Sequence, residues 1–154
     1  MRVLAIDPGY GRMGLAVVEG NPSKPTFVYS ECVETHKDDT DRLAAIARAL
    51  ARALKQYSPD LVAIEALFFS NNAKTAMRVG EARGALLSVV QELGVPIKEY
   101  SPQEVKMAVT GMGNADKSAV ARMLPRLIQL PEKKRLDDEM DALALGICAL
   151  AHRL

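Results

Sequence analysis

The chain has 154 residues, of which 49% are hydrophobic and 25% charged, and its formal net charge is +1. A chain of this length buries about two-thirds of its unfolded surface in one core, which favours a single domain over residues 1–154 and excludes a second one. It holds no run of the roughly 18 apolar residues that a membrane span needs and no recognisable signal peptide, so we expect a cytoplasmic protein without membrane contact.

The first part of the chain predicts three short strands followed by a helix. The strands cover residues 2–7, 13–18 and 26–34, which are apolar or β-branched runs separated by Gly and Pro. Because the intervals between them are too short for crossover helices, the strands should pair antiparallel through tight turns. From Thr40 the apolar residues recur at helical spacing, with Asp39 or Thr40 as the helix cap.

The rest of the chain predicts strands and helices in turn. We expect strands over residues 61–65 and 95–100, and helices over residues 72–93 (ended by Gly94), from residue 101, from about residue 115, and over residues 137–152. Ser101, Pro102 and Glu104 fit a capping box, in which Glu104 serves the cap rather than the chemistry. This order predicts an α/β fold whose mixed five-stranded sheet has three antiparallel and then parallel strands, flanked by helices.

Three glycines near the N-terminus, Gly9, Gly11 and Gly14, match the pattern G-x-G-x-x-G. A dinucleotide-binding loop of this kind needs a helix directly after the glycines, because the pyrophosphate rests on the N–H groups of that helix. Here only "LAVVEG" follows before Asn21-Pro22, which is too short and too β-branched for a helix. The match is therefore accidental, and we expect the glycines to make turns beside Asp7.

Carboxylates stand at three places where strands end or a helix begins. Asp7 ends the first apolar run and Glu65 ends "LVAIE", so two acids terminate neighbouring strands. On the last helix Asp141 shares one face with Asp138, three residues before it, or with Asp137, four residues before it, and helix geometry alone leaves this choice open. An acid at one strand end is usually a cap or a surface group, but the set together predicts a site.

Such a cluster requires a cation. Two carboxylates about 4 Å apart repel each other by about 4 kcal/mol at an effective dielectric constant of about 20. Oxygen ligands favour Mg²⁺, with Mn²⁺ as a chemically similar substitute, and the chain has no Cys and His set for zinc. Two such ions about 3.5–4 Å apart can activate water and stabilise the leaving oxygen of a phosphodiester.

The distribution of charge fits a polyanionic substrate. Residues 1–73 carry 8 basic and 9 acidic side chains, residues 74–135 carry 11 and 6, and residues 136–154 carry 1 and 4. Runs of charge are usually solvated surface, but a basic region followed by an acidic one also suits a protein that grips a polyanion and reacts with it elsewhere.

Several motifs together resemble the RuvC family of Holliday-junction resolvases, in order and over nearly the whole chain. They are "IDPG", "AIE", "LFFSNNAKTAMRVGEARG", "EYSPQEVKMAVTGMGNADKSAV" and "DDEMDALALG". The resemblance implies a ribonuclease-H-like fold and a homodimer that resolves four-way DNA junctions by paired nicks, leaving 5′-phosphate and 3′-hydroxyl ends. It further implies that two Mg²⁺ ions are held by four catalytic acids, Asp7, Glu65, Asp138 (rather than Asp137) and Asp141. RuvA and RuvB, the branch-migration proteins, are the implied partners.

The resemblance also implies DNA contacts. Phe68 would stack on an unpaired base, with Phe69 as its support, and Lys106 and Lys117 would lie near the scissile phosphate. Contacts to the DNA backbone are expected from Lys74, Arg78, Arg83, Arg122 and Arg126. Each of these could equally be an ordinary core or surface residue.

Glycines interrupt the helix predicted over residues 72–93. Gly80 and Gly84 each cost the helix up to about 1 kcal/mol relative to Ala. In the family this helix lies at the dimer interface, where small residues allow close approach. Close packing within one subunit would account for the glycines equally well.

Three other functions are less consistent with the sequence. A different ribonuclease-H-like nuclease, such as the related pre-rRNA-processing family, lacks the motifs around Phe68, Lys106 and Lys117. An actin-like sugar kinase or ATPase needs a second domain that this chain is too short to contain. A junction-binding module without catalysis would not require all four acids.

Overall fold

The computed structural model describes residues 1–9, 11–35, 41–66 and 73–152, and only the backbone of residues 73 and 74. Its strands are β1 (Arg2–Pro8), β2 (Arg12–Asn21), β3 (Lys24–Glu34), β4 (Leu61–Glu65) and β5 (Ile97–Tyr100). Its helices are α1 (Arg42–Tyr57), α2 (Ala73–Glu92), α3 (Pro102–Thr110), α4 (Lys117–Leu127) and α5 (Asp137–Ala151). In the described part of the chain, no helix is both long enough and apolar enough to cross a membrane.

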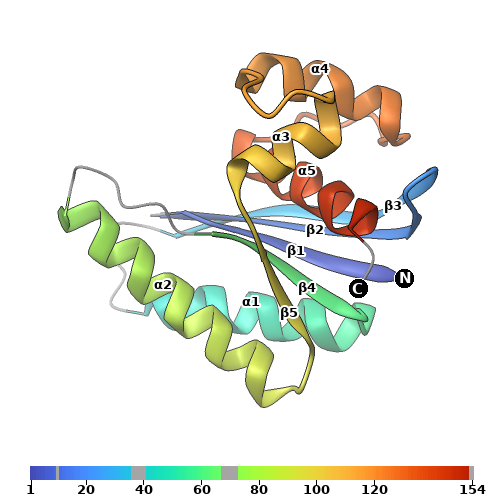
Figure 1. Cartoon of the computed structure of the whole chain (residues 1–154). Helices are drawn as coiled ribbons and strands as arrows, with labels where there is room; N and C mark the ends of the chain where they lie inside the picture. Colours follow the sequence, from blue (N-terminus) through green and yellow to red (C-terminus); the bar gives the residue numbers. More distant parts are fainter. Residues whose placement is uncertain (10, 36–40, 67–72, 153–154) are drawn as a thin grey trace.

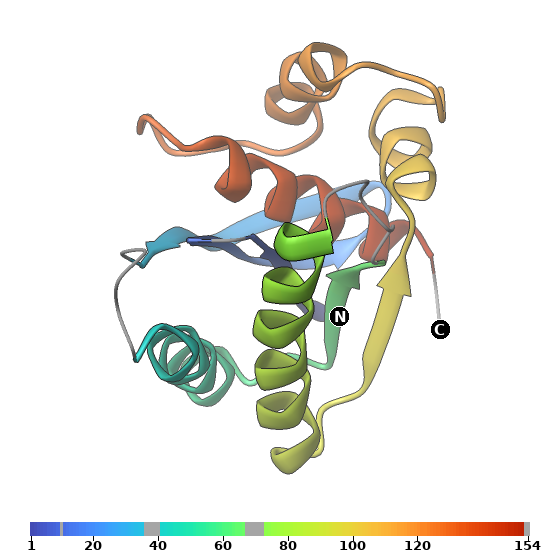
Figure 2. The ribbon, with the colours of Figure 1, turned by 90° about the vertical axis from the view of Figure 1, so that its left-hand side faces the viewer.

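The five strands form one mixed sheet in the order β3-β2-β1-β4-β5. β1 pairs antiparallel with β2, and β2 antiparallel with β3, whereas β4 runs parallel to both β1 and β5. α1 and α2 cover one face of the sheet; α5 lies against the other face, with α3 and α4 packed outside it (Figures 1 and 2). The α/β fold with a mixed five-stranded sheet is confirmed.

The alternation of side chains along the strands divides the core into two layers. Val3 and Ala5 of β1 pack toward α5, whereas Leu4 and Ile6 pack toward α1 and α2. β4 alternates in the same way: Leu61 and Ala63 lie on the α5 side, and Val62 and Ile64 on the other. Because side chains two residues apart share a face, this period places the acids that end both strands on the side covered by α5.

The ends of the helices follow from local hydrogen bonding. α3 begins with the predicted capping box: the Ser101 hydroxyl accepts from the Glu104 N–H, and the Glu104 carboxylate accepts from the Ser101 N–H. The Ser101 N–H and the Ser101 hydroxyl both donate to the Glu104 carboxylate, which lowers the pKa of Glu104. The predicted cap of α1 was wrong, because Asp41 occupies the N-cap position and makes no side-chain capping bond there; Asp39 and Thr40 lie outside the described residues.

Candidate active site

Asp7 and Glu65 are neighbours because β1 and β4 run parallel and in register. Val3 pairs with Leu61, and the pairing continues to Ile6 and Ile64, so the next residue of each strand is an acid. Arg83 of α2 holds the end of β4, since its Nη1 donates to the Glu65 carbonyl oxygen at 2.8 Å. The two carboxylates therefore stand side by side at one edge of the sheet.

Gly14 brings the third group of acids to this edge. It pairs with Asp7 across the antiparallel ladder and lies inside β2, within the strand predicted over residues 13–18, so it does not make the turn expected of it. A Cβ atom at this position would lie 1.9 Å from the carbonyl oxygen of Asp138. The first turn of α5 thus rests directly on the backbone of β2, and only glycine leaves room for this approach.

The acids of α5 differ in their surroundings. Asp141 lies with its Oδ2 2.9 Å from Lys117 Nζ. Asp138 has a side chain only 19% exposed, and its Oδ2 lies 3.2 Å from Arg12 Nε but forms no hydrogen bond with any described residue. Asp137 is 79% exposed and 3.6 Å from Lys117 Nζ. Of the two alternatives for the partner of Asp141, the structure turns Asp138 toward the sheet and Asp137 toward solvent.

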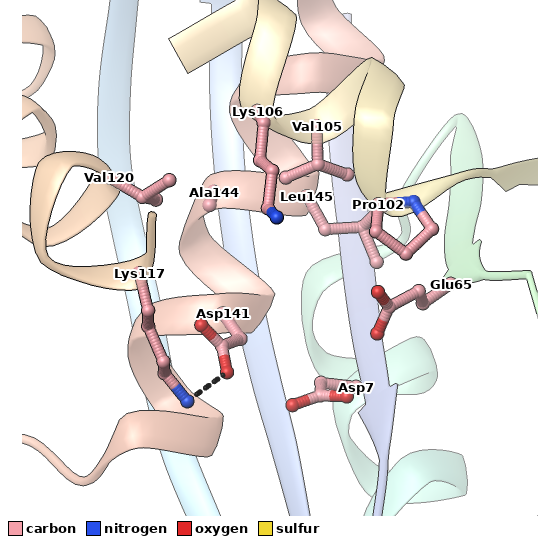
Figure 3. A pocket seen from close by; sticks show the side chains of 10 residues that line it. All are labelled: Asp7, Glu65, Pro102, Val105, Lys106, Lys117, Val120, Asp141, Ala144 and Leu145. Carbon is pink, nitrogen blue, oxygen red and sulfur yellow. Dashed lines mark ion pairs between the residues drawn. The ribbon is translucent and has the colours of Figure 1, made fainter. Parts of the chain in front are cut away.

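A pocket of about 270 Å³ lies between the ends of β1 and β4 and the helices α3, α4 and α5. The carboxylates of Asp7, Glu65 and Asp141 and the amines of Lys106 and Lys117 face the same space (Figure 3). Its apolar wall consists of Pro102, Val105, Val120, Ala144 and Leu145. Lys106 is the middle residue of α3 and Lys117 is the first residue of α4, so two helices direct positive charge toward three acids.

The pKa values show that the negative charge of this site is incompletely balanced. Burial, followed by the charges of Glu65, Asp141 and Asp138, raises the pKa of Asp7 from its ordinary value of 3.8 to about 7. Burial and the charge of Asp141 also raise the pKa of Glu65. The hydrogen bond to Asp141 raises the pKa of Lys117, which keeps this amine charged. Added positive charge would therefore be strongly favoured here.

The donor set fits a hard divalent cation. All the acids offer oxygen, and the buried Asp138 Oδ2 lacks a hydrogen bond. Within the described ranges no three His, Cys, Asp or Glu side chains already form a metal-ligand group. Lys117 and Arg12 instead form ion pairs with the carboxylates of Asp141 and Asp138.

The other predicted contacts have different outcomes. Phe68 and Phe69 lie outside the described residues, as does the side chain of Lys74. Arg83 is not an exposed DNA contact: it is 6% exposed and pairs with Glu99 at 2.7 Å as well as with β4. Arg122, by contrast, is exposed on α4.

Sequence reasoning missed Arg12, which pairs with Asp138, and Glu139, which is 2% exposed between Asp138 and Asp141. A signal for Glu139 was present, because Leu143 follows it by four residues and so marks the buried face of α5. No comparable signal existed for Arg12, whose partner is distant in the sequence.

A mixed five-stranded sheet with acids at the ends of β1 and β4 and at the start of α5 defines a nuclease of the ribonuclease-H-like class. The family model described as "Crossover junction endodeoxyribonuclease RuvC" matches residues 3–149. The chain belongs to this family, and membership implies dependence on a divalent metal ion.

Individual relatives are similar over almost the whole chain. The Thermosipho melanesiensis crossover junction endodeoxyribonuclease RuvC is 42% identical over 150 residues, covering 96% of both chains. The structure of T. thermophilus RuvC in complex with Holliday junction substrate is 35% identical, with a TM-score of 0.90, and the match covers 96% of this chain and 92% of that one. The yeast mitochondrial Holliday junction resolvase Ydc2, at 14% identity, 96% and 77% coverage and a TM-score of 0.70, shares the fold.

Proposed function

We propose that this chain is a structure-specific endonuclease that resolves four-way DNA junctions by paired nicks, leaving 5′-phosphate and 3′-hydroxyl ends. The observation that carries the proposal is the convergence of three carboxylates and two lysines in one pocket of a RuvC-family fold. The relative solved with a Holliday junction substrate supports the same class of DNA. We further propose that residues 1–154 act as one domain.

Asp7, Glu65, Asp138 and Asp141 are proposed to be the catalytic acids and to hold two Mg²⁺ ions, for which Mn²⁺ can substitute. When bound, such a pair of ions activates water and stabilises the leaving oxygen of the phosphodiester. The raised pKa of Asp7 supports the assignment, because burial and three neighbouring acids disfavour its charge until a cation is present.

The protein's own cations are suited to holding the phosphate. Lys106 and Lys117 line the pocket from two different helices, so a phosphate that enters between them meets an amine on either side. These two lysines are therefore proposed to position the scissile phosphate against the acids.

Further DNA contacts are proposed in the part of the chain that follows Glu65. Phe68 is proposed to stack on an unpaired base, supported by Phe69, because their segment follows directly after Glu65 in the chain. Lys74 and Arg78 belong to the start of α2, which follows that segment, and are proposed to contact the DNA backbone.

The test compares four-way junctions with linear duplexes of the same sequences, in Mg²⁺ and in EDTA. We expect paired nicks near the branch point of the junction, in Mg²⁺ only, and products that DNA ligase can reseal because their ends are 5′-phosphate and 3′-hydroxyl. Linear duplexes cut as fast as junctions, or cleavage that persists in EDTA, would contradict the proposal.

A homodimer is proposed to form through α2. Met77, Gly80 and Gly84 are three and four residues apart and so share one face of this helix. Met77 is 63% exposed, and a Cβ atom at either glycine would meet no atom of the described residues within 4 Å. Packing against the described part of the subunit therefore does not explain the glycines, which favours a second subunit as the partner. RuvA and RuvB are proposed as further partners from family membership.

Gly84→Glu should weaken this dimer by about 100-fold or more, because the symmetry of a two-fold interface brings the two new carboxylates together. Sedimentation velocity at micromolar protein would then show monomer where the wild type shows dimer. Gln56→Glu adds the same charge on the exposed surface of α1 and should leave the dimer intact. A wild-type monomer at these concentrations, or a dimer unaffected by Gly84→Glu, would contradict the α2 interface.

A further inference from the structure

The buried carboxylate of Glu139 takes no part in the proposed chemistry. It lies in the first turn of α5, between Asp138 and Asp141, and is 2% exposed. A charge so deeply buried is stable only when it is paired and hydrogen-bonded. Its partners therefore indicate what the residue does.

Glu139 is held by three groups from two other parts of the chain. Ser30 Oγ of β3 donates to its Oε1 at 2.5 Å, Lys133 Nζ donates to the same oxygen at 3.0 Å, and Arg135 Nε lies 3.4 Å away. We refer to Glu139, Ser30, Lys133 and Arg135 as the Glu139 cluster. It joins α5 to β3 and to the segment before α5.

Arg135 is itself fixed within this cluster. Its side chain is 6% exposed, its Nε also donates to Ser30 Oγ at 3.3 Å, and its Nη1 donates to the Pro131 carbonyl oxygen at 3.0 Å. The guanidinium lies 5.4 Å from the centre of the Phe27 ring. Because each buried charge depends on the other, the cluster is stable only as a whole.

The cluster adds a second tie to the first turn of α5. Gly14 lets this turn approach the backbone of β2, and the hydrogen bond that Ser30 donates to Glu139 joins the same turn to β3, so a rotation of α5 about its own axis would break that bond. A rotation of about 20° would move a side-chain tip on the helix surface by about 2 Å. Metal ligands must be held to within about 0.5 Å, so such a rotation would separate Asp138 and Asp141 from Asp7.

We propose that the Glu139 cluster is a positioning device for metal binding: it locks the rotation of α5 so that Asp138 and Asp141 share a divalent cation with Asp7. This inference rests on the proposed function, in which these three acids are ligands. Glu139 and Arg135 are positioning residues, since they act through α5 and touch neither metal nor DNA.

Replacing Arg135 distinguishes a positioning role from an electrostatic one, because the two roles predict opposite changes in the affinity for a cation. Arg135→Met deletes a positive charge near the acids, so a purely electrostatic role predicts tighter cation binding. Positioning predicts the opposite, a loss of about 10-fold or more in Mn²⁺ affinity. Lys134→Met deletes the same charge from the exposed neighbouring residue, which lies outside the cluster, and should not weaken binding.

The experiment titrates the folded full-length protein with Mn²⁺ and follows the free ion by electron paramagnetic resonance, with circular dichroism as the check of folding. Ser30→Ala changes no charge and should also weaken binding; it decides the question if Arg135→Met does not fold. Variants that bind Mn²⁺ as tightly as the wild type would overturn the positioning role alone. A wild type that binds no Mn²⁺, or binds it equally after Asp7→Asn, would overturn the proposed metal site and the positioning role with it.

Discussion

Asp7→Asn is expected to abolish junction cleavage and, at the same time, to make the metal-free protein more stable. Metal ions contribute several kcal/mol of transition-state stabilisation, and a loss of about 4 kcal/mol lowers the rate by about 1,000-fold. The gain in stability has a separate cause. Burial and the charges of Glu65, Asp141 and Asp138 oppose ionisation of Asp7 in the folded chain, and asparagine removes that unfavourable charge.

The gain in stability on Asp7→Asn should depend on pH, and its direction follows from the pKa of Asp7. The pKa of Asp7 is about 7 in the folded protein and 3.8 ordinarily, so between these values the folded state binds more protons than the unfolded state. The free energy of unfolding of the metal-free protein therefore falls as pH rises through this window, by about 4 kcal/mol at most. Asp7→Asn removes this part of the decrease, so its advantage over the wild type should be greatest above about pH 7.

Urea unfolding in EDTA at several pH values, together with junction cleavage in Mg²⁺, measures both effects. Added Mg²⁺ should raise the midpoint of the wild type more than that of Asp7→Asn, because binding to the folded state alone stabilises it. Asp137→Asn is the matched control, since Asp137 is exposed and should leave stability and rate nearly unchanged. A variant that cuts at the wild-type rate, or that is less stable than the wild type above about pH 7, would contradict the role given to Asp7.

Periodicity and chain order were enough to predict the sheet and the two strand-end acids. The apolar run from Val3 to Ile6 predicted a buried strand that ends at Asp7, and in the structure Val3 and Ala5 face α5 whereas Leu4 and Ile6 face α1 and α2. Because β4 pairs parallel with β1, Glu65 lies at the same end of the two strands as Asp7. Patterns of this kind depend only on residues close together in the sequence, so they can be recognised without knowledge of the tertiary structure.

The sequence could not predict which charged side chains are buried or paired within the protein. From the sequence, Arg83 is expected to contact the DNA backbone, yet Leu86 and Val90, three and seven residues later, mark the buried face of α2 on which it lies. Its burial depends on partners at Glu65 and Glu99, which no local pattern connects to it. The pairs of Arg12 with Asp138 and of Lys117 with Asp141 depend on tertiary structure in the same way.

Gly14→Ala adds only one methyl group but should strongly lower the free energy of unfolding of this protein. The added Cβ would lie 1.9 Å from the carbonyl oxygen of Asp138 and 2.5 Å from its carbonyl carbon. Backbone atoms cannot rotate away as side chains do, so α5 must move off β2 or the strand must bend. Overpacking costs about 1–3 kcal/mol even where side chains can adjust, and we expect at least about 3 kcal/mol here.

Cleavage should fall even where Gly14→Ala remains folded. A displacement of α5 by about 1 Å carries Asp138 and Asp141 away from Asp7, and misplacement on this scale costs about 100-fold in rate. Gly113→Ala is the matched control, because its Cβ would make only ordinary contacts, the nearest at 3.5 Å, and its stability should stay within about 0.5 kcal/mol of the wild type. If Gly14→Ala unfolds at the wild-type urea midpoint and cuts junctions at the wild-type rate, the contact of α5 with β2 does not position the acids.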